Sequence, residues 1–284
     1  MKKILLLFLA IGIMVLLSGC QNTISTDFDL NQGELLTIIP SVEKYDYDVL
    51  GIEQIKQPKG VLVTSEKIFV SDAEKHCIHI FDLDGNYVSS FGSLGMENGS
   101  FFRPSGMAWQ NDKLYVVDSK NCRIQVFDEH YLYIKSYSLT KIDYDDPYKC
   151  IAVTPDEDIY ITSTSALPQY SHIYHIHPQD GRQSFIGNSI IGSVCLAKNK
   201  VLFSESYEIT NRSGNISYTT GLNRLFEIRE EKMNFVAELP YMYCPMNMIY
   251  HDGSIYSVSL RYSTLDKFDM EGNYVETLFQ IPDE

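Results

Sequence analysis

Histidine is the residue type in this chain that is best suited to acid–base or metal chemistry. Five of the seven histidines fall in two short stretches, 76–79 and 172–177. His175 and His177 are two residues apart, so in a strand both side chains lie on one face. Two imidazoles could form part of a zinc site, but such sites use at least three protein ligands. Since no third ligand is evident, we interpret the pair as a solvated strand face and expect no metal and no cofactor.

Acidic residues at the ends of apolar runs are the next candidates for chemistry. Asp72 and Asp118 each follow such a run, and they occupy the same place in two similar segments. This repetition indicates a structural role, in which the carboxylate accepts backbone N–H groups of the following turn. Residues 82–86 have the composition of a calcium loop, but no glutamate follows at the required distance, so a hairpin turn is predicted. We therefore assign no catalytic residue.

The six cysteines include Cys20 and five others, Cys77, Cys122, Cys150, Cys195 and Cys244. An odd number cannot pair completely within one chain, and the spacing matches no zinc motif. Cys150 and Cys195 occupy matching places in adjacent repeats and could lie close together. Small buried thiols are the default interpretation, and whether this pair is bonded stays open.

The N-terminus has the pattern of a secretory signal. Lys2 and Lys3 precede an uncharged apolar run over residues 4–17, which is too short for a lasting transmembrane span. The run leads through small residues into Cys20, a pattern that resembles the bacterial lipobox; an ordinary signal peptide or a buried strand are the alternatives. The resemblance implies that residues 1–19 are removed and that Cys20 carries acyl chains. Residues 20–33 are polar and predict a tether, which leaves residues 34–284 as the folded domain.

Internal repeats predict the fold. Residues 57–82 match residues 103–128 at a constant shift, and weaker copies cover 147–176, 195–228 and 248–279. Each copy holds about four short apolar strands separated by turn residues, which is the pattern of a β-propeller blade. An Asp-Gly, Glu-Gly or similar turn falls between the third and fourth strands of several copies. The chain is therefore predicted to be all-β.

The first two copies carry motifs of a known repeat: Pro104-Ser105-Gly106, a strand that ends at Asp118, and Arg123-Ile124-Gln125-Val126-Phe127-Asp128. They resemble NHL repeats. The resemblance is weak over residues 147–281, where Ser163, Glu205 or Ser259 replaces the aspartate and the arginine is lost. With the lipobox, the whole chain is similar to TolB-like six-bladed propeller lipoproteins. The resemblance implies about six four-stranded blades, five clear repeats plus a partial N-terminal one within residues 35–51; a five-bladed ring is the alternative.

Charge and location restrict the partners. The net charge of −14 should repel phosphate backbones, so nucleic-acid binding is not expected. The lipid anchor on Cys20 implies membrane attachment at the bacterial cell envelope, outside the cytoplasm. We interpret the chain as a binding module for an envelope protein, a peptide or a glycan. The alternative is a hydrolase or lyase that uses the channel mouth of the propeller.

By analogy with other propellers, the loops after the second and fourth strands of each blade share one mouth. In this sequence those loops are the long ones, and they are rich in tyrosine. Tyrosine and arginine are frequent at contact hot spots. The predicted ligand-binding residues are Tyr144, Asp145, Tyr148, Tyr207, Arg212, Tyr241, Tyr243, Arg261 and Tyr262.

Overall fold

The computed structural model describes residues 55–141, 148–163, 172–187, 190–212, 215–220, 223–240, 245–259, 262 and 264–280, without the side chains of 207–222, 246 and 279. The predicted signal peptide, the tether and the partial blade within residues 35–51 lie outside these residues. In the described part, all regular structure is β-strand. No helix there is long and apolar enough to cross a membrane.

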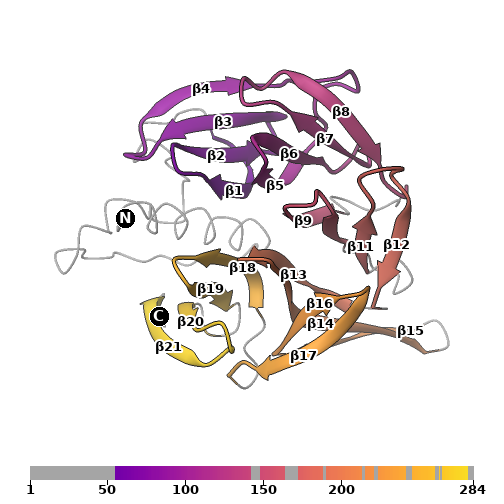
Figure 1. Cartoon of the computed structure of the whole chain (residues 1–284), viewed down its shortest axis with the longest axis vertical. Coiled ribbons are helices and arrows are strands. Elements are labelled where there is room, and N and C mark those ends of the chain that lie inside the picture. Colours follow the sequence, from indigo (N-terminus) through magenta and orange to yellow (C-terminus); the bar gives the residue numbers. More distant parts are fainter. Residues whose placement is uncertain are drawn as a thin grey trace. The chain divides into compact units, whose positions relative to one another are not determined.

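Among the described residues, those up to Ser105 form one compact unit and those from Gly106 onward form another. The first unit contains a four-stranded antiparallel sheet whose strands follow one another in chain order. Its strands, indigo and purple in Figure 1, are β1 (Pro58–Val63), β2 (Lys67–Asp72), β3 (Cys77–Asp82) and β4 (Tyr87–Phe91).

Four further sheets follow, and β5 begins where the two units divide. The second sheet consists of β5 (Pro104–Gln110), β6 (Lys113–Asp118), β7 (Arg123–Phe127) and β8 (Tyr133–Ser138). The third consists of β9 (Tyr148–Val153), β10 (Ile159–Ser163), β11 (Ile173–Ile176) and β12 (Gln183–Ile186). The fourth consists of β13 (Ile190–Ala197), β14 (Lys200–Arg212), β15 (Asn215–Thr220), β16 (Arg224–Arg229) and β17 (Lys232–Glu238). The fifth consists of β18 (Pro245–His251), β19 (Ser254–Ser259), β20 (Thr264–Phe268) and β21 (Tyr274–Gln280).

These sheets are the predicted blades, and the all-β propeller prediction is confirmed. Within the second unit, neighbouring blades pack face to face through alternate apolar side chains. Val117 and Ile124 of the second sheet, for example, share a buried layer with Ile159 and Tyr174 of the third. Similar layers join the third sheet to the fourth and the fourth to the fifth. Since a fully buried aliphatic side chain contributes about 1.5–3 kcal/mol, these layers hold adjacent blades together.

Tight hairpins connect the third and fourth strands of the blades, as predicted. Gly85, Gly181 and Gly272 all have positive φ, at 88°, 68° and 84°. The Asp82 carboxylate accepts the backbone N–H groups of Asp84 at 2.9 Å and of Asn86 at 2.8 Å. The segment that resembles a calcium loop is therefore a hairpin turn, since its first carboxylate is engaged by the turn itself.

The first strands of consecutive blades approach very closely near two glycines. A Cβ atom on Gly60 would lie 2.4 Å from the carbonyl oxygen of Ser105, and one on Gly106 would lie 2.2 Å from that of Lys149. Ser71 donates its hydroxyl to the same Ser105 carbonyl at 2.7 Å. A side chain at either glycine would need the neighbouring backbone to shift.

The stretch 204–223, predicted as a long loop, contains most of a β-hairpin (Figure 1). Strand β14 has 13 residues, but it pairs with β16 only over Val201–Ser204. Beyond this point, residues Tyr207–Arg212 pair with β15 instead. Strand β14 stays paired with the first strand, β13, as far as Glu208, and only its last residues continue beyond β13 as a two-stranded ribbon with β15.

Strand register corrects one part of the repeat alignment. Asp118 pairs with Arg123, whose Nε donates to the carboxylate at 2.7 Å. In the fourth blade, Arg224 Nε donates a hydrogen bond of 2.6 Å to the Glu205 carboxylate. Both residues directly adjoin the cross-strand pair of Ser204 and Leu225. The arginine predicted to be lost in the later copies is thus retained in the fourth, with glutamate as its partner.

Register also changes the interpretation of two cysteines. Ile151 pairs with Ile161, two residues before the strand end at Ser163, and Val194 pairs with Phe203 at the equivalent place. The residue that matches Cys150 is therefore Ser193, and the predicted match with Cys195 is wrong. Cys150 and Cys195 are both free thiols.

Candidate functional site

Asp72 at the end of β2 is fully buried and saturated with hydrogen bonds. Its carboxylate accepts backbone N–H groups from the following turn, those of Glu74 and Lys75, each at 3.0 Å. It also accepts the N–H groups of Lys56 at 2.6 Å and Gln57 at 3.1 Å. This confirms the structural role predicted for Asp72, which joins the chain before β1 to the turn after β2.

A histidine completes the surroundings of Asp72. His79 on β3 places Nε2 3.4 Å from Asp72 Oδ2 and 3.6 Å from the Cys77 sulfur. Burial by itself raises the pKa of Asp72, but the hydrogen bonds from His79 and from the backbone outweigh it and lower that pKa to about 2. Burial, followed by the nearby Asp72 charge, raises the pKa of Cys77 to about 11. Asp72 and His79 therefore form a buried pair with a structural role.

Asp118 has the same role in the second blade with other donors. Its Oδ2 accepts hydrogen bonds from Asn121 Nδ2 at 2.8 Å, Arg123 Nε at 2.7 Å and Gln125 Nε2 at 3.2 Å. Gln125 stands at the position that His79 occupies in the first blade. Buried charges need such partners, so both aspartates stabilise their blades.

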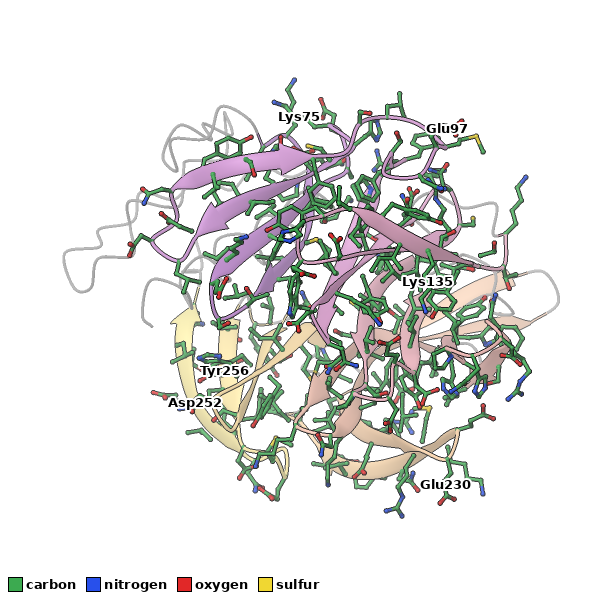
Figure 2. All side chains as sticks on the ribbon, turned by 45° about the horizontal axis from the view of Figure 1, so that its top comes forward. Lys75, Glu97, Lys135, Glu230, Asp252 and Tyr256 are labelled. Carbon is green, nitrogen blue, oxygen red and sulfur yellow. The ribbon has the colours of Figure 1, made fainter. Side chains whose placement is uncertain are left out.

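A second histidine cluster lies between the third and fourth blades, at the ends where their turns are short. Strand β11 presents His175 opposite Tyr160 of β10, and His177 follows directly after β11. Asp158 comes from the turn that precedes β10. Glu231 comes from the turn between β16 and β17, where Glu230 is labelled in Figure 2.

Two carboxylates enclose the His175 ring in this cluster. Its Nε2 lies 2.9 Å from Asp158 Oδ1, and its Nδ1 lies 3.2 Å from Glu231 Oε1. His177 Nε2 is 3.4 Å from the same Glu231 oxygen, and the two imidazole centroids are 4.2 Å apart. The Tyr160 ring stacks on His175 at 4.5 Å with an interplanar angle of 3°, which fixes the plane of the imidazole.

Burial and charge differ across this cluster. The side chain of His175 is 8% exposed and that of His177 is 19% exposed, whereas those of Asp158 and Glu231 are 33% and 44% exposed. Hydrogen bonds from Ser184 and His175 lower the pKa of Glu231. The cluster therefore has a buried imidazole side and an open carboxylate side.

These contacts correct the prediction for the histidine pair. His175 is buried, so the two histidines do not form a solvated strand face. The ligand atoms of Asp158, His175 and His177 all lie within 4.8 Å of one another, which supplies the third group that was not evident from spacing. The signal available in the sequence was the separation of two between the histidines; Asp158 and Glu231 are brought in by turns of two blades.

The structure separates the predicted ligand-binding residues. Tyr148 is fully buried, packs edge-on against Tyr174 and donates its hydroxyl to the Thr140 carbonyl. Its assignment as a contact residue is therefore wrong, because the side chain belongs to the layer between two blades. Tyr262 follows the second strand of the fifth blade and is 44% exposed.

The other predicted residues are on the hairpin or outside the described part of the chain. Tyr207 and Arg212 are on β14, in the portion that pairs with β15, and Tyr207 also pairs with Ile191 of β13. The structure does not describe Tyr144, Asp145, Tyr241, Tyr243 and Arg261.

The blades define the chain as a β-propeller, and comparison with known proteins agrees. Residues 53–186 match a family described as a 6-bladed beta-propeller. No curated protein matches the chain.

Similar solved structures share the fold at low identity. A nidogen/laminin complex has a TM-score of 0.55 at 12% identity, over 78% of this chain and 80% of that one. Hydrazine synthase of Kuenenia stuttgartiensis has a TM-score of 0.54 at 17% identity, over 76% and 65%. A catalytically inactive virginiamycin B lyase from Staphylococcus aureus, determined with quinupristin, has a TM-score of 0.50 at 14% identity, over 80% and 85%. At these identities the similarity concerns the fold alone.

Proposed function

We propose that the chain is a lipid-anchored propeller of the bacterial cell envelope that binds a protein, peptide or glycan through the ends of its blades. Residues 1–19 act as the signal peptide, Cys20 carries the lipid, and residues 20–33 connect it to the propeller. The NHL-like motifs and the lipobox support a relationship with TolB-like propeller lipoproteins. The acyl chains hold the propeller at a membrane surface outside the cytoplasm.

The β14–β15 hairpin is the observation that carries the binding function. It extends from the second strand of the fourth blade, and the sequence predicts long loops after the second strands of other blades as well. It brings Tyr207, Arg212 and Tyr218 onto one pair of strands, in the part of β14 that lies beyond its pairing with β16. Tyrosine supplies contact area at low entropic cost and arginine supplies forked donors, as in many binding surfaces.

The strand-end acids favour binding over hydrolysis or lyase chemistry. Asp72, Asp118 and Glu205 would be the natural acid–base candidates of the repeats. All three are buried and engaged in hydrogen bonds that join parts of a blade. An acid whose lone pairs are committed in this way is a poor general base.

The experiment is capture of partners from native envelopes by the lipidated chain and by two triple variants. Tyr207→Ala, Arg212→Ala and Tyr218→Ala together should weaken capture about 30-fold or more, since hot-spot residues contribute about 2 kcal/mol each with imperfect additivity. The control replaces two aromatics and one arginine elsewhere, Phe235→Ala and Tyr274→Ala on the outer strands β17 and β21 and Arg229→Ala at the end of β16, all of them exposed. Equal capture by both folded variants would contradict a role for the hairpin.

Anchoring has its own test. Cys20→Ser should release the chain from membranes, because no acyl chain can then be attached. Fractionation of the variant with membranes after a salt wash would contradict the lipoprotein proposal.

A further inference from the structure

We propose that Asp158, His175 and His177 bind one divalent transition-metal ion of the zinc class, and that Glu231 positions His175 for it. The site belongs to the short-turn ends of the third and fourth blades. It is separate in the topology from the β14–β15 hairpin, which leaves the fourth blade at its other end.

The ligand atoms are already close to the arrangement that one ion requires. In zinc sites the nitrogen and oxygen ligands lie about 2.0–2.2 Å from the metal, which places them roughly 3–4 Å from one another. His175 Nε2 and Asp158 Oδ1 are 2.9 Å apart, and the His177 ligand atom lies within 4.8 Å of both residues' ligand atoms. A small rotation of the partly exposed His177 ring would close the set.

The second nitrogen of His175 has the partner that metal-binding histidines usually have. Such a histidine donates its other N–H to a carboxylate or carbonyl, which fixes the tautomer and the direction of the ring. Here Nδ1 lies 3.2 Å from Glu231 Oε1, so Nε2 is the nitrogen that is left for the metal. Tyr160 stacks on the same ring and restricts its rotation further.

An ion-pair network without metal accounts for less of the geometry. A protonated His175 between Asp158 and Glu231 would satisfy those three groups by itself. This ion-pair network does not account for His177 Nε2. That atom is buried and makes no hydrogen bond in the structure, although it is 3.4 Å from Glu231 Oε1. A bound cation gives this nitrogen a role and offsets the two negative charges.

The ligand types select the metal. Two imidazoles and a carboxylate suit zinc and its first-row neighbours, whereas calcium and magnesium are bound almost entirely by oxygen. Three protein ligands leave a position for water. That position faces the open side of the cluster, because the carboxylates are the more exposed groups.

Binding would connect two blades. Asp158, His175 and His177 come from the third sheet, and Glu231 comes from a turn of the fourth in which Glu230 and Glu231 both have positive φ, 51° and 57°. L-residues adopt this conformation at an energetic cost, and the turn uses it to bring Glu231 to His175. Metal binding should therefore stabilise the junction between these blades.

The experiment uses the full chain in detergent, without a histidine tag and stripped of metal with EDTA. Titration with Zn²⁺ followed by calorimetry should give one equivalent per chain, and Co²⁺ should produce the visible absorption bands of a low-symmetry site. The melting temperature should rise with Zn²⁺ concentration, as expected for a ligand that binds only the folded state.

Four variants distinguish this site from adventitious binding. His177→Ala should weaken Zn²⁺ binding by at least 100-fold. Asp158→Asn preserves the shape of the side chain and should have the same effect, so it serves as the test if His177→Ala folds poorly. Glu231→Gln should cost about 10–100-fold, the usual effect of losing a carboxylate that orients a ligand. His130→Ala removes a histidine that is 75% exposed and should leave binding unchanged. Absence of Zn²⁺ binding by the wild type, or binding that survives both His177→Ala and Asp158→Asn, would overturn the proposal.

Discussion

His79 and His175 are both on the third strand of a blade and both face an aspartate, yet their surroundings are opposite in character. The side chains of His79 and Asp72 are 2% and 0% exposed, and their closest atoms are 3.4 Å apart. His175 and Asp158 are 8% and 33% exposed, with closest atoms 2.9 Å apart. One pair is enclosed within a blade, and the other opens toward solvent between two blades.

The difference lies in what else the carboxylate binds. Asp72 ends a second strand, where the following turn and the chain before β1 present four backbone N–H groups to it. Asp158 precedes a second strand, and it shares the His175 imidazole with a second carboxylate, Glu231, which contacts the other ring nitrogen. A carboxylate whose oxygens already accept several hydrogen bonds stabilises the fold, whereas a carboxylate with lone pairs to spare can take part in binding.

Removal of the enclosed carboxylate should have the largest effect on stability. Asp72→Ala leaves four backbone donors and His79 without an acceptor in a buried site. Loss of one partner from a buried charged network typically costs about 3–5 kcal/mol in the free energy of unfolding. Urea unfolding followed by circular dichroism measures this; Asp128→Ala, in an exposed turn, should cost only a fraction of it. Equal losses in the two variants would break the contrast between buried and exposed acids.

Acid should weaken the same site over a defined range. The pKa of Asp72 is about 2 in the folded chain, below its ordinary value of about 3.9. A lowered pKa contributes stability above pH 4–5, and this contribution is lost as the pH falls through 2. The difference corresponds to about 2.5 kcal/mol. Urea midpoints from pH 6 to pH 2 should show this loss in the wild type and lack it in Asp72→Asn; the same pH profile in both would argue against the shift.

The smallest effect is expected at the open site without metal. Glu231→Gln removes a side chain that is 44% exposed, and exposed ion pairs contribute little to stability. In EDTA, its urea midpoint should therefore stay close to that of the wild type. A large drop in EDTA would mean that the cluster is a structural network like the one around Asp72, which would remove the distinction between the two pairs.

The fold could be predicted because its signals are local and repeated. The copies at a constant shift, the Asp-Gly-Asn turn at 84–86 and the strand-end Asp72 all depend on residues close in sequence. The hairpin at 204–223 was missed although its tyrosine, threonine and isoleucine content favours strand and Ser213-Gly214 is a turn signal. The pairing of β14 with β15 is local, with Arg212 opposite Asn215, so the sequence carried the signal for this hairpin.

The candidate site could be predicted only in part. The spacing of His175 and His177 was visible, but Asp158 is 17 residues before His175 and Glu231 is 56 residues after it. Pairing of β10 with β11 brings Asp158 to the histidines, and packing of the fourth blade on the third brings Glu231, so no local sequence pattern records the whole set. The prediction for Tyr148 was wrong because face-to-face packing of blades places this residue, at the start of β9, in the buried layer.

The close approach at Gly60 and Gly106 bears on how such a chain could have arisen by duplication. The absent Cβ atom makes room for the carbonyl of the following copy, so each glycine is required chiefly by its neighbour. Cys150, Ser193 and Asn247 hold the corresponding places later in the chain, where the register puts them opposite the end of the second strand. A duplicated copy inserted among these later ones would be under no pressure to keep its glycine. Descent from a single ancestral repeat would then be most visible in the sequence at the positions where the backbones of adjacent copies lie closest.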